Sequence, residues 1–281
     1  MRAAVAALIV CLAVPVPARA QDHREDHDYW SSIFADFFMG PQKKDEFRWH
    51  GRIAPGATLE IKGVNGRISA RPSTGKEIEL VAVKRGRRND PKEVEIAFVE
   101  RDGGLTVCAV YPSRDGSKPN DCQPGKGGRM SVRNNDVVVD FELSVPAGVS
   151  FVARSVNGRI DAQGIAGDVA AYTVNGSVHV TSDGHVEAET VNGSIEAAMG
   201  KADWKEAATF KTVNGSVSLA LPGGANTLLR VETVNGSIAN DFPLNGPAKK
   251  TRRELSGVIG QGGRELQVRT VNGSVEIRKA S

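Results

Sequence analysis

The sequence predicts an all-β fold, a β-solenoid (β-helix-like) with coils of about 19 residues, and three observations support this prediction. The tripeptide Val-Asn-Gly occurs seven times, and the last six copies are 18, 17, 22, 21 and 37 residues apart. Apolar and polar residues alternate on both sides of each copy, as in half-buried β-strands. The alternation changes phase at each motif, which indicates a turn or corner there. The seven asparagines are Asn65, Asn157, Asn175, Asn192, Asn214, Asn235 and Asn272.

The longest interval contains a degenerate copy of the motif. Leu255-Ser256-Gly257-Val258-Ile259 fits the Val-Asn-Gly-Ser-Ile pattern, with Ser256 in the place of Asn. Ser256 divides the interval of 37 residues into 21 and 16. We therefore expect an additional coil between those of Asn235 and Asn272.

Two structures can explain the change of phase, as residues 186–197 illustrate. Asn-Gly is a strong signal for a two-residue β-hairpin, so an antiparallel hairpin array is the alternative fold. A hairpin would place Val191 on the outer face beside Glu189 and Glu196, where an apolar residue in every copy is hard to explain. At a solenoid corner, with Asn in the left-handed region, we expect Val191 to point inward with Ile195. The asparagines would then stack about every 4.8 Å as a structural turn ladder.

The N-terminal β-rich portion spans residues 47–149, and the Val-Asn-Gly repeat solenoid spans residues 150–279. We interpret 47–279 as one continuous domain. Within the first portion, alternating stretches at 57–71, 77–84, 94–100, 105–111 and 137–145 predict strands. Residues 111–135 are rich in Pro, Gly, Ser and Asn, which predicts a long loop.

The cysteines and the N-terminus indicate an exported protein. Arg2, the apolar residues 3–16 and the Ala18-Arg19-Ala20 site are typical of a signal peptide, residues 1–20. Location in the periplasm, on the cell surface or in the medium is left open. Cys11 lies inside this segment. The remaining pair, Cys108 and Cys122, is expected to form a disulfide in an oxidising compartment, with two unpaired thiols as the alternative.

The N-terminal tail, residues 21–46, contains an aromatic amphipathic segment at 28–39. Its apolar residues recur at helical spacing, which predicts a short helix. We expect this helix to cover the first coil, with membrane-surface contact and partner docking as alternatives. The apolar residues are Trp30, Ile33, Phe34, Phe37 and Phe38.

The motifs also resemble a known family. Residues 55–68 fit Pro-Gly-x-x-Leu-x-Ile-x-x-Val-Asn-Gly-x-Ile, and Thr-Val-Asn-Gly-Ser-Ile/Val then recurs. Residues 257–263, Gly-Val-Ile-Gly-Gln-Gly-Gly, precede the last copy of the motif. Over about 47–278 the chain resembles the bacterial putative-adhesin family, a domain of unknown function. The resemblance implies a β-solenoid-like domain with no known cofactor and no recognised catalytic residue.

The residues give little indication of catalysis. Gly-x-Ser-x-Gly, His-Glu-x-x-His and P-loop motifs are absent from the sequence. A catalytic carboxylate pair on adjacent coils would suit a polysaccharide-active enzyme, although outward carboxylates on strands usually only contact solvent. The candidate carboxylates are Glu187, Glu189, Glu196, Asp161 and Asp168. His23 and His27 could bind a metal weakly, but their acidic surroundings favour a solvated tail, and His179 and His185 flank a turn with Asp183 that we expect at the surface.

The formal charge of the chain limits the kinds of partner that we expect it to bind. Removal of Arg2 and Arg19 with the signal lowers the formal net charge from +3 to +1, which gives no global electrostatic case for nucleic acid. Two basic runs, Lys84–Arg88 and Lys249–Arg253, are solvated loops or contacts for anionic envelope polymers. Neither run is interleaved with aromatics, as single-strand binding would require.

The sequence therefore favours a non-catalytic, exported, adhesin-like β-repeat scaffold or binding module of the cell envelope, with no cofactor and no metal. An envelope accessory or stress-response component that docks a membrane partner is the alternative. A polysaccharide-active β-helix enzyme is a weaker one. The partner is unknown, with an envelope polymer, a glycan or a membrane-associated protein as candidates.

Overall fold

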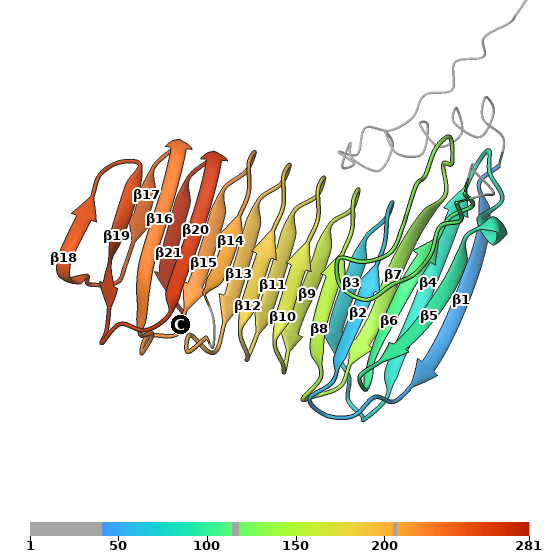
Figure 1. Ribbon diagram of the computed structural model, residues 1–281, viewed down its shortest axis with the longest axis horizontal. Helices are drawn as coiled ribbons and strands as arrows, with labels where there is room; N and C mark the ends of the chain where they lie inside the picture. The colour runs from blue at the N-terminus through green and yellow to red at the C-terminus, as the bar shows by residue number, and fades with distance from the viewer. Residues whose placement is uncertain (1–40, 114–117, 205–206, 281) are drawn as a thin grey trace, which may run out of the picture. The chain divides into compact units, whose positions relative to one another are not determined.

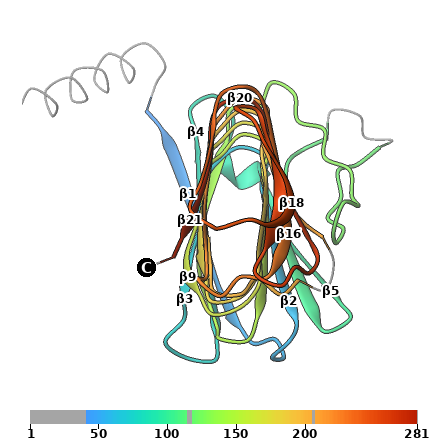
Figure 2. The same ribbon diagram turned by 90° about the vertical axis from the view of Figure 1, so that its left-hand side faces the viewer.

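The chain winds into stacked coils, each of which contributes one strand to each of two facing sheets (Figures 1 and 2). The computed structural model describes residues 41–113, 118–204 and 207–280. The expected signal peptide, the aromatic segment at 28–39, His23 and His27 lie outside these residues. Gln42–Ser281 forms one structural unit. The solenoid is thus the fold observed, and the hairpin array is not.

The coil strands pair in parallel with the strands of neighbouring coils. The eleven-stranded sheet takes β2 (Thr58–Lys62), β8 (Ser150–Arg154), β10 (Val169–Tyr172), β12 (Val186–Glu189), β14 (Ala208–Lys211), β16 (Thr227–Asn235) and β20 (Glu265–Asn272). The ten-stranded sheet takes β3 (Ile68–Pro72), β9 (Ile160–Ile165), β11 (Val178–Ser182), β13 (Ile195–Met199), β15 (Val217–Leu221), β17 (Ile238–Asn240) and β21 (Val275–Lys279). Alternate residues of both sheets point between them and form one continuous hydrophobic core.

Antiparallel strands extend both ends of the stack. At the N-terminal end, β1 (Lys43–Gly51) and β4 (Ile78–Gly86) join β7 (Val138–Val145), while β5 (Glu95–Arg101) joins β6 (Gly104–Val110). A 3₁₀ turn, η1 (Pro91–Glu93), precedes β5. At the C-terminal end, β18 (Asn245–Lys250) and β19 (Glu254–Ile259) extend the sheet beyond β16. β1 begins four residues before the expected start of the β-rich portion at 47.

The coils do not stack in sequence order. β20 lies between β14 and β16, so Asn272 bridges Asn214 on one side and Asn235 on the other. The expectation that Asn214 and Asn235 are neighbours, with Ser256 as a further rung, is therefore wrong. Ser256 lies on β19, opposite Arg230 in an antiparallel pair. The reason is that the segment 241–259 forms an antiparallel extension beyond β16. The chain then returns toward the middle of the sheet, where β20 pairs with both β14 and β16.

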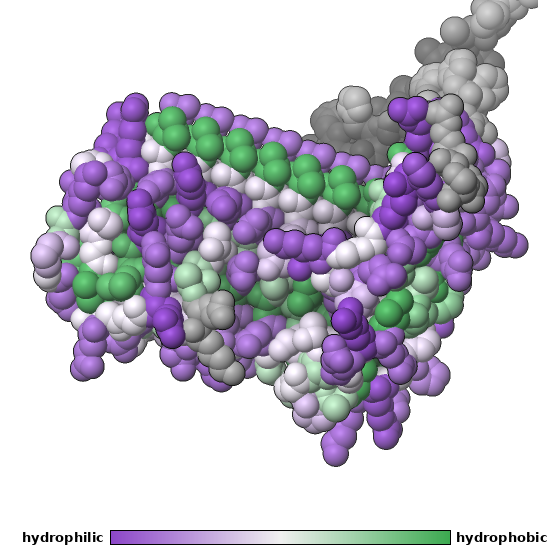
Figure 3. Space-filling view, in the orientation of Figure 1, coloured by the Kyte–Doolittle hydropathy of each residue, from purple (hydrophilic) through white to green (hydrophobic). Residues whose placement is uncertain are grey.

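The corner valines point outward, which is opposite to the inward position that we expected for Val191. The Val residues of five motifs are 38 to 48% exposed, and they contribute to an apolar ridge along one edge of the stack (Figure 3). These valines are Val156, Val174, Val191, Val213 and Val234. Neighbouring rungs cover the rest of each side chain, so the solenoid tolerates the residue that we expected inside.

The residue before each valine is the one that points inward. Thr190 is buried, and its hydroxyl donates to the carbonyl of Gly176 on the neighbouring coil at 2.9 Å. Thr212 makes the same bond to Gly193 at 2.8 Å. A buried hydroxyl is costly unless it is bonded, so the Thr-Gly contact explains why Thr precedes Val in the motif.

The motif glycines allow the corners to stack closely. A Cβ built on Gly176 would lie 2.2 Å from the carbonyl oxygen of Gly158, so no side chain fits between these coils. The corner asparagines do not adopt the left-handed conformation that we expected. In the described part of the chain, the non-glycine residues with positive φ are Asp102 and Asn134. Close approach of backbones, rather than a left-handed turn, is the reason for this motif.

Candidate functional site

The strands β6 and β7 form a coil that lacks the Val-Asn-Gly corner. β6 pairs in parallel with β2, and β7 pairs in parallel with β3, so both stack on the coil that contains Asn65. The amide of Val139 donates to the carbonyl of Asn65 at 2.8 Å, where the next corner would begin. Between the two strands, a long loop replaces the three-residue corner. Its described part, residues 118–136, covers outward side chains of the eleven-stranded sheet.

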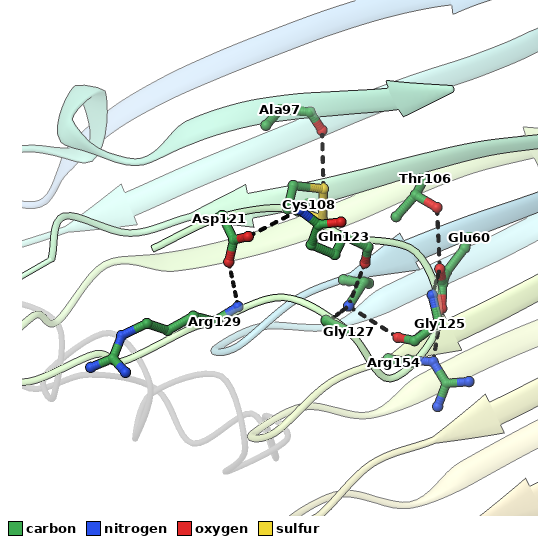
Figure 4. The surroundings of a disulfide bond; sticks show 12 residues. Glu60, Ala97, Thr106, Cys108, Asp121, Gln123, Gly125, Gly127, Arg129 and Arg154 are labelled. Atoms are coloured by element: carbon green, nitrogen blue, oxygen red, sulfur yellow. Dashed lines mark hydrogen bonds and ion pairs between the residues drawn. A yellow bond between two sulfur atoms is a disulfide. The ribbon is translucent and has the colours of Figure 1, made fainter. Parts of the chain in front are cut away.

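The loop is fixed at both of its ends. The disulfide between Cys108 and Cys122 ties it to β6 (Figure 4). The hydroxyl of Tyr111 donates to the carbonyl of Val137 at 2.9 Å, which closes the base of the loop. Burial raises the pKa of Tyr111 well above its ordinary value, while hydrogen bonds from Asn65 act the other way. Tyr111 thus stays a neutral hydrogen-bonding group at the end of the coil stack.

Glu60 points to the outer face of its sheet and is nevertheless only 5% exposed, because the loop covers it. Its carboxylate accepts hydrogen bonds from the amide of Gly125 at 2.7 Å, the hydroxyl of Thr106 at 3.2 Å and Nε of Arg154 at 2.8 Å (Figure 4). A buried carboxylate is stable only with such partners. Glu60 therefore joins the loop, β6 and β8 at one point.

Lys62 holds the same loop two residues further along β2. Its ammonium group donates to the carbonyls of Gln123, Gly125 and Gly127 at 2.8, 3.1 and 2.7 Å. Burial lowers the pKa of Lys62, and the nearby charge of Arg154 acts in the same direction, whereas Glu60 opposes them. All three protons of the ammonium group are used, so Lys62 positions the loop and contributes charge.

Arg154 lies beside these groups and is held from two sides. Its Nε donates to Glu60, and its guanidinium carbon lies 4.1 Å from the centre of the Tyr172 ring. Tyr172 is itself fixed, because its hydroxyl donates to Glu187 at 3.0 Å. Burial, together with the Glu187 carboxylate, raises the pKa of Tyr172 to about 12. These two contacts hold the guanidinium group, and the Arg154 side chain is 23% exposed.

A cleft of about 710 Å³ lies between the loop and the corners of the first two coils. One wall comes from 62–65 and 154–157, including the first rungs of the Asn ladder. The other wall comes from the loop, whose Met130 and Val132 are apolar and whose 125–128 presents backbone groups. Both walls thus combine polar and apolar groups, an arrangement suited to binding a small ligand or a polymer segment.

The Asn ladder leads to this cleft. Each side-chain amide donates to the side-chain oxygen of the next Asn at 2.7 to 2.9 Å, in one direction along the whole stack. The order is Asn235, Asn272, Asn214, Asn192, Asn175, Asn157 and Asn65. Asn65 and Asn157 line the cleft. Aligned amides polarise one another, so the ladder makes a rigid support for the cleft.

The carboxylates that the sequence suggested as a catalytic pair are not placed opposite one another on adjacent coils. His179 stands between Asp161 and Glu196 in register. Tyr172 and Lys211 stand on either side of Glu189. Asp168 and Asp203 instead contact the ring of His185, at 3.1 and 2.8 Å. Within the described ranges, no group of three or more His, Cys, Asp and Glu side chains could hold a metal ion.

The first basic run does not form a free cationic patch. Lys84 is buried and pairs with Asp45 at 2.6 Å, and Arg85 pairs with Asp140. In the second run, Lys249 pairs with Glu254 at 2.5 Å. The contact surface that we considered at Lys84–Arg88 is therefore largely neutralised within the sheet.

Glu60, Lys62, Arg154 and Tyr172 were missed in the sequence. Their alternation with apolar residues predicts an outward position, but nothing in the pattern shows that a loop covers that face. The Cys pair was the available signal, since it places 122 beside 108 and hence beside β2.

Comparison with known proteins gives a family-model match over the second half of the chain. Residues 143–278 match the Toastrack DUF4097 model. The chain is similar to the crystal structure of a putative cell adhesion protein from Clostridium sporogenes, with 12% identity, 85% of this chain and 100% of that chain covered, and a TM-score of 0.45. It is also similar to a putative adhesin from Bacteroides fragilis, with 14% identity, 84% and 97% covered, and a TM-score of 0.30.

No curated relative matches the chain. Among the described residues, no helix is long and apolar enough to cross a membrane. The repeats and the two facing parallel sheets agree with this match, and residues 143–278 fit a Toastrack DUF4097 domain, a domain of unknown function.

Proposed function

We propose that this chain is an exported, non-catalytic binding module of the cell envelope, and that it recognises its ligand in the cleft under the disulfide-tied loop. The observation that carries the proposal is the replaced corner. The Asn65 coil is stacked on a coil whose corner has become a long, covalently fixed loop, and the cleft lies at this place.

A fixed loop on a regular scaffold is suited to recognition. Loops carried by rigid elements commonly bind ligands, and a loop that is already ordered loses little entropy on binding. The disulfide and the three bonds of Lys62 supply that order here. The proposal that the protein is exported rests on the signal-like residues 1–20 and on the disulfide, which persists in oxidising compartments.

The titratable groups beside the cleft favour binding over catalysis. Lys62 is occupied by three carbonyls, and Asp121 accepts from the amide of Arg129 at 2.5 Å and from the side chain of Gln123 at 3.1 Å. Both groups hold the loop in place, and general acid–base chemistry needs a group that is available to a substrate.

The test is a binding screen of the mature chain against envelope glycans and polymers, with two matched variants. Val156→Trp fills the mouth of the cleft, whereas Val213→Trp places the same ring at an equivalent, 38% exposed corner away from it. We expect at least a tenfold loss of affinity for Val156→Trp and no loss for Val213→Trp. Equal binding by both variants, or no binding to any polymer of the panel, would contradict the proposal.

A further inference from the structure

We infer that Arg154 is a preformed receptor for an oxyanion, a carboxylate or phosphate group carried by the ligand. The inference rests on the proposed function and adds the chemistry of recognition. Arg154 uses only Nε toward Glu60. In the described part of the chain, neither of its two Nη groups donates a hydrogen bond.

The contacts around Glu60 explain why the guanidinium group keeps this capacity. A structural Arg–carboxylate pair is often bidentate, with two parallel N–H to oxygen bonds. Here Oε2 of Glu60 is taken by the amide of Gly125 and the hydroxyl of Thr106, and only Oε1 is left for Arg154. The guanidinium group is held by one bond and by the Tyr172 ring, so its outer edge stays available.

The charges around the cleft favour an anion. Three cations, Lys62, Lys126 and Arg154, line it together with Asp121, and Glu60 adjoins Arg154. The net charge of these five residues is +1. Both carboxylates accept backbone amides of the loop, from Gly125 and Arg129. Both carboxylates are thus engaged by the loop, whereas among the described residues the Nη groups of Arg154 donate no hydrogen bond.

The geometry of arginine indicates the class of ligand group. A planar guanidinium matches a carboxylate or a phosphate through two parallel hydrogen bonds, which a lysine cannot reproduce. Val64, Val156, Met130 and Val132 line the same cleft and would contact the uncharged body of the ligand. An acidic saccharide and a phosphate-bearing polymer share this chemistry.

The experiment titrates the mature protein with glucuronate, inorganic phosphate and neutral glucose. Each is followed by calorimetry in wild type, Arg154→Lys and Arg269→Gln. Arg154→Lys keeps a charge beside Glu60, and a thermal melt of each variant checks that it is folded. Arg269 is the control, because it lies on β20 at an equivalent outward position of the same sheet, 51% exposed.

We expect wild type and Arg269→Gln to bind at least one oxyanion more tightly than glucose, and Arg154→Lys to lose at least tenfold of that affinity. Glucuronate and phosphate separate the saccharide source from the phosphate source. Equal oxyanion binding by folded Arg154→Lys, or no oxyanion binding by wild type, would overturn the inference.

Failure of the inference can be told apart from failure of the proposed function. If a neutral polymer binds, and Val156→Trp but not Arg154→Lys abolishes it, the cleft binds its ligand without the oxyanion contact. If Val156→Trp leaves all binding unchanged, the cleft itself is not the site.

Discussion

The corner at Asn175 and the segment between β6 and β7 occupy equivalent places in two coils, and they are built in opposite ways. The Asn175 corner consists of three residues held by the neighbouring coils on both sides. Backbone contacts and side-chain hydrogen bonds to Asn157 and Asn192 hold it. The segment between β6 and β7 is held by a disulfide and by side chains from the sheet beneath it. Repetition fixes the first, and individual contacts fix the second. A corner can thus be replaced by a long loop while the strands of that coil still pair with the neighbouring coil.

The largest expected effect is on the repeated corner. Gly176→Ala places a Cβ 2.2 Å from the carbonyl oxygen of Gly158 and must push two coils apart. We expect the free energy of unfolding to fall by about 3 kcal/mol or more, as for severe overpacking. Gly224→Ala is the control, because a Cβ there meets no atom within 4 Å. Urea denaturation measures both, and equal midpoints would contradict the tight stacking of corners.

The second prediction concerns the loop. The Cys108→Ala, Cys122→Ala double variant loses a crosslink between residues 14 apart in sequence, which the chain-entropy model values at about 3 kcal/mol. We expect lower stability and faster hydrogen exchange at 118–136, with unchanged protection of the corner amides at 175 and 192. Loss of protection in both regions alike would show that the loop and the stack are one cooperative structure.

The third prediction concerns the pH dependence of stability that arises from Asp136, near the C-terminal end of the loop. The Asp136 carboxylate accepts the amides of Arg87, Arg88 and Asn89 at 2.9 to 3.1 Å. Burial alone would raise the pKa of Asp136, but these bonds outweigh it and lower the pKa to about 2. A lowered pKa in the folded state stabilises the protein above the unfolded value of 3.8, and the contribution is lost as pH falls to about 2.

Asp136→Asn should therefore lower stability at pH 7 by about 2 kcal/mol, and the difference from wild type should shrink toward pH 2. Asp102→Asn, with a 91% exposed carboxylate, is the control and should behave as wild type. Thermal melts from pH 7 to pH 2 measure this. If the difference in stability between Asp136→Asn and wild type does not depend on pH, the hydrogen bonds from the three backbone amides do not explain the role of Asp136.

The smallest effect is expected on the ridge. Val191→Thr changes a side chain that is 39% exposed and should alter stability by less than about 0.5 kcal/mol. Val186→Thr buries a hydroxyl at a 1% exposed site and should cost about 1–3 kcal/mol. Calorimetric melting compares the two. A larger effect at Val191 would mean that the corner valine belongs to the core after all.

The sequence predicted the coil and the ladder because both depend on local repetition. Val186, Ala188 and Ile195 alternate as strand residues and are buried, and the seven asparagines stack. The direction of Val191 was predicted wrongly, because periodicity shows that the phase changes at a corner and does not show which residue turns outward.

The order of the last coils and the cleft could not be predicted from periodicity. Asn272 lies 58 residues from Asn214, and nothing in the local sequence indicates that β20 pairs with β14. Likewise, Glu60 and Arg154 are 94 residues apart and meet only because β2 and β8 pair in parallel under the loop. The Cys pair indicated the loop but not the face that it covers.

The most direct test of the central claim is amide chemical-shift mapping of the mature chain during titration with a polymer selected by the screen. We expect shifts at 125–128 and at the corner amides of Asn65 and Asn157, which line the cleft. We expect no shift at the distant corners of Asn214 and Asn235. Shifts confined to those distant corners, with none at 125–128, would contradict binding in the cleft.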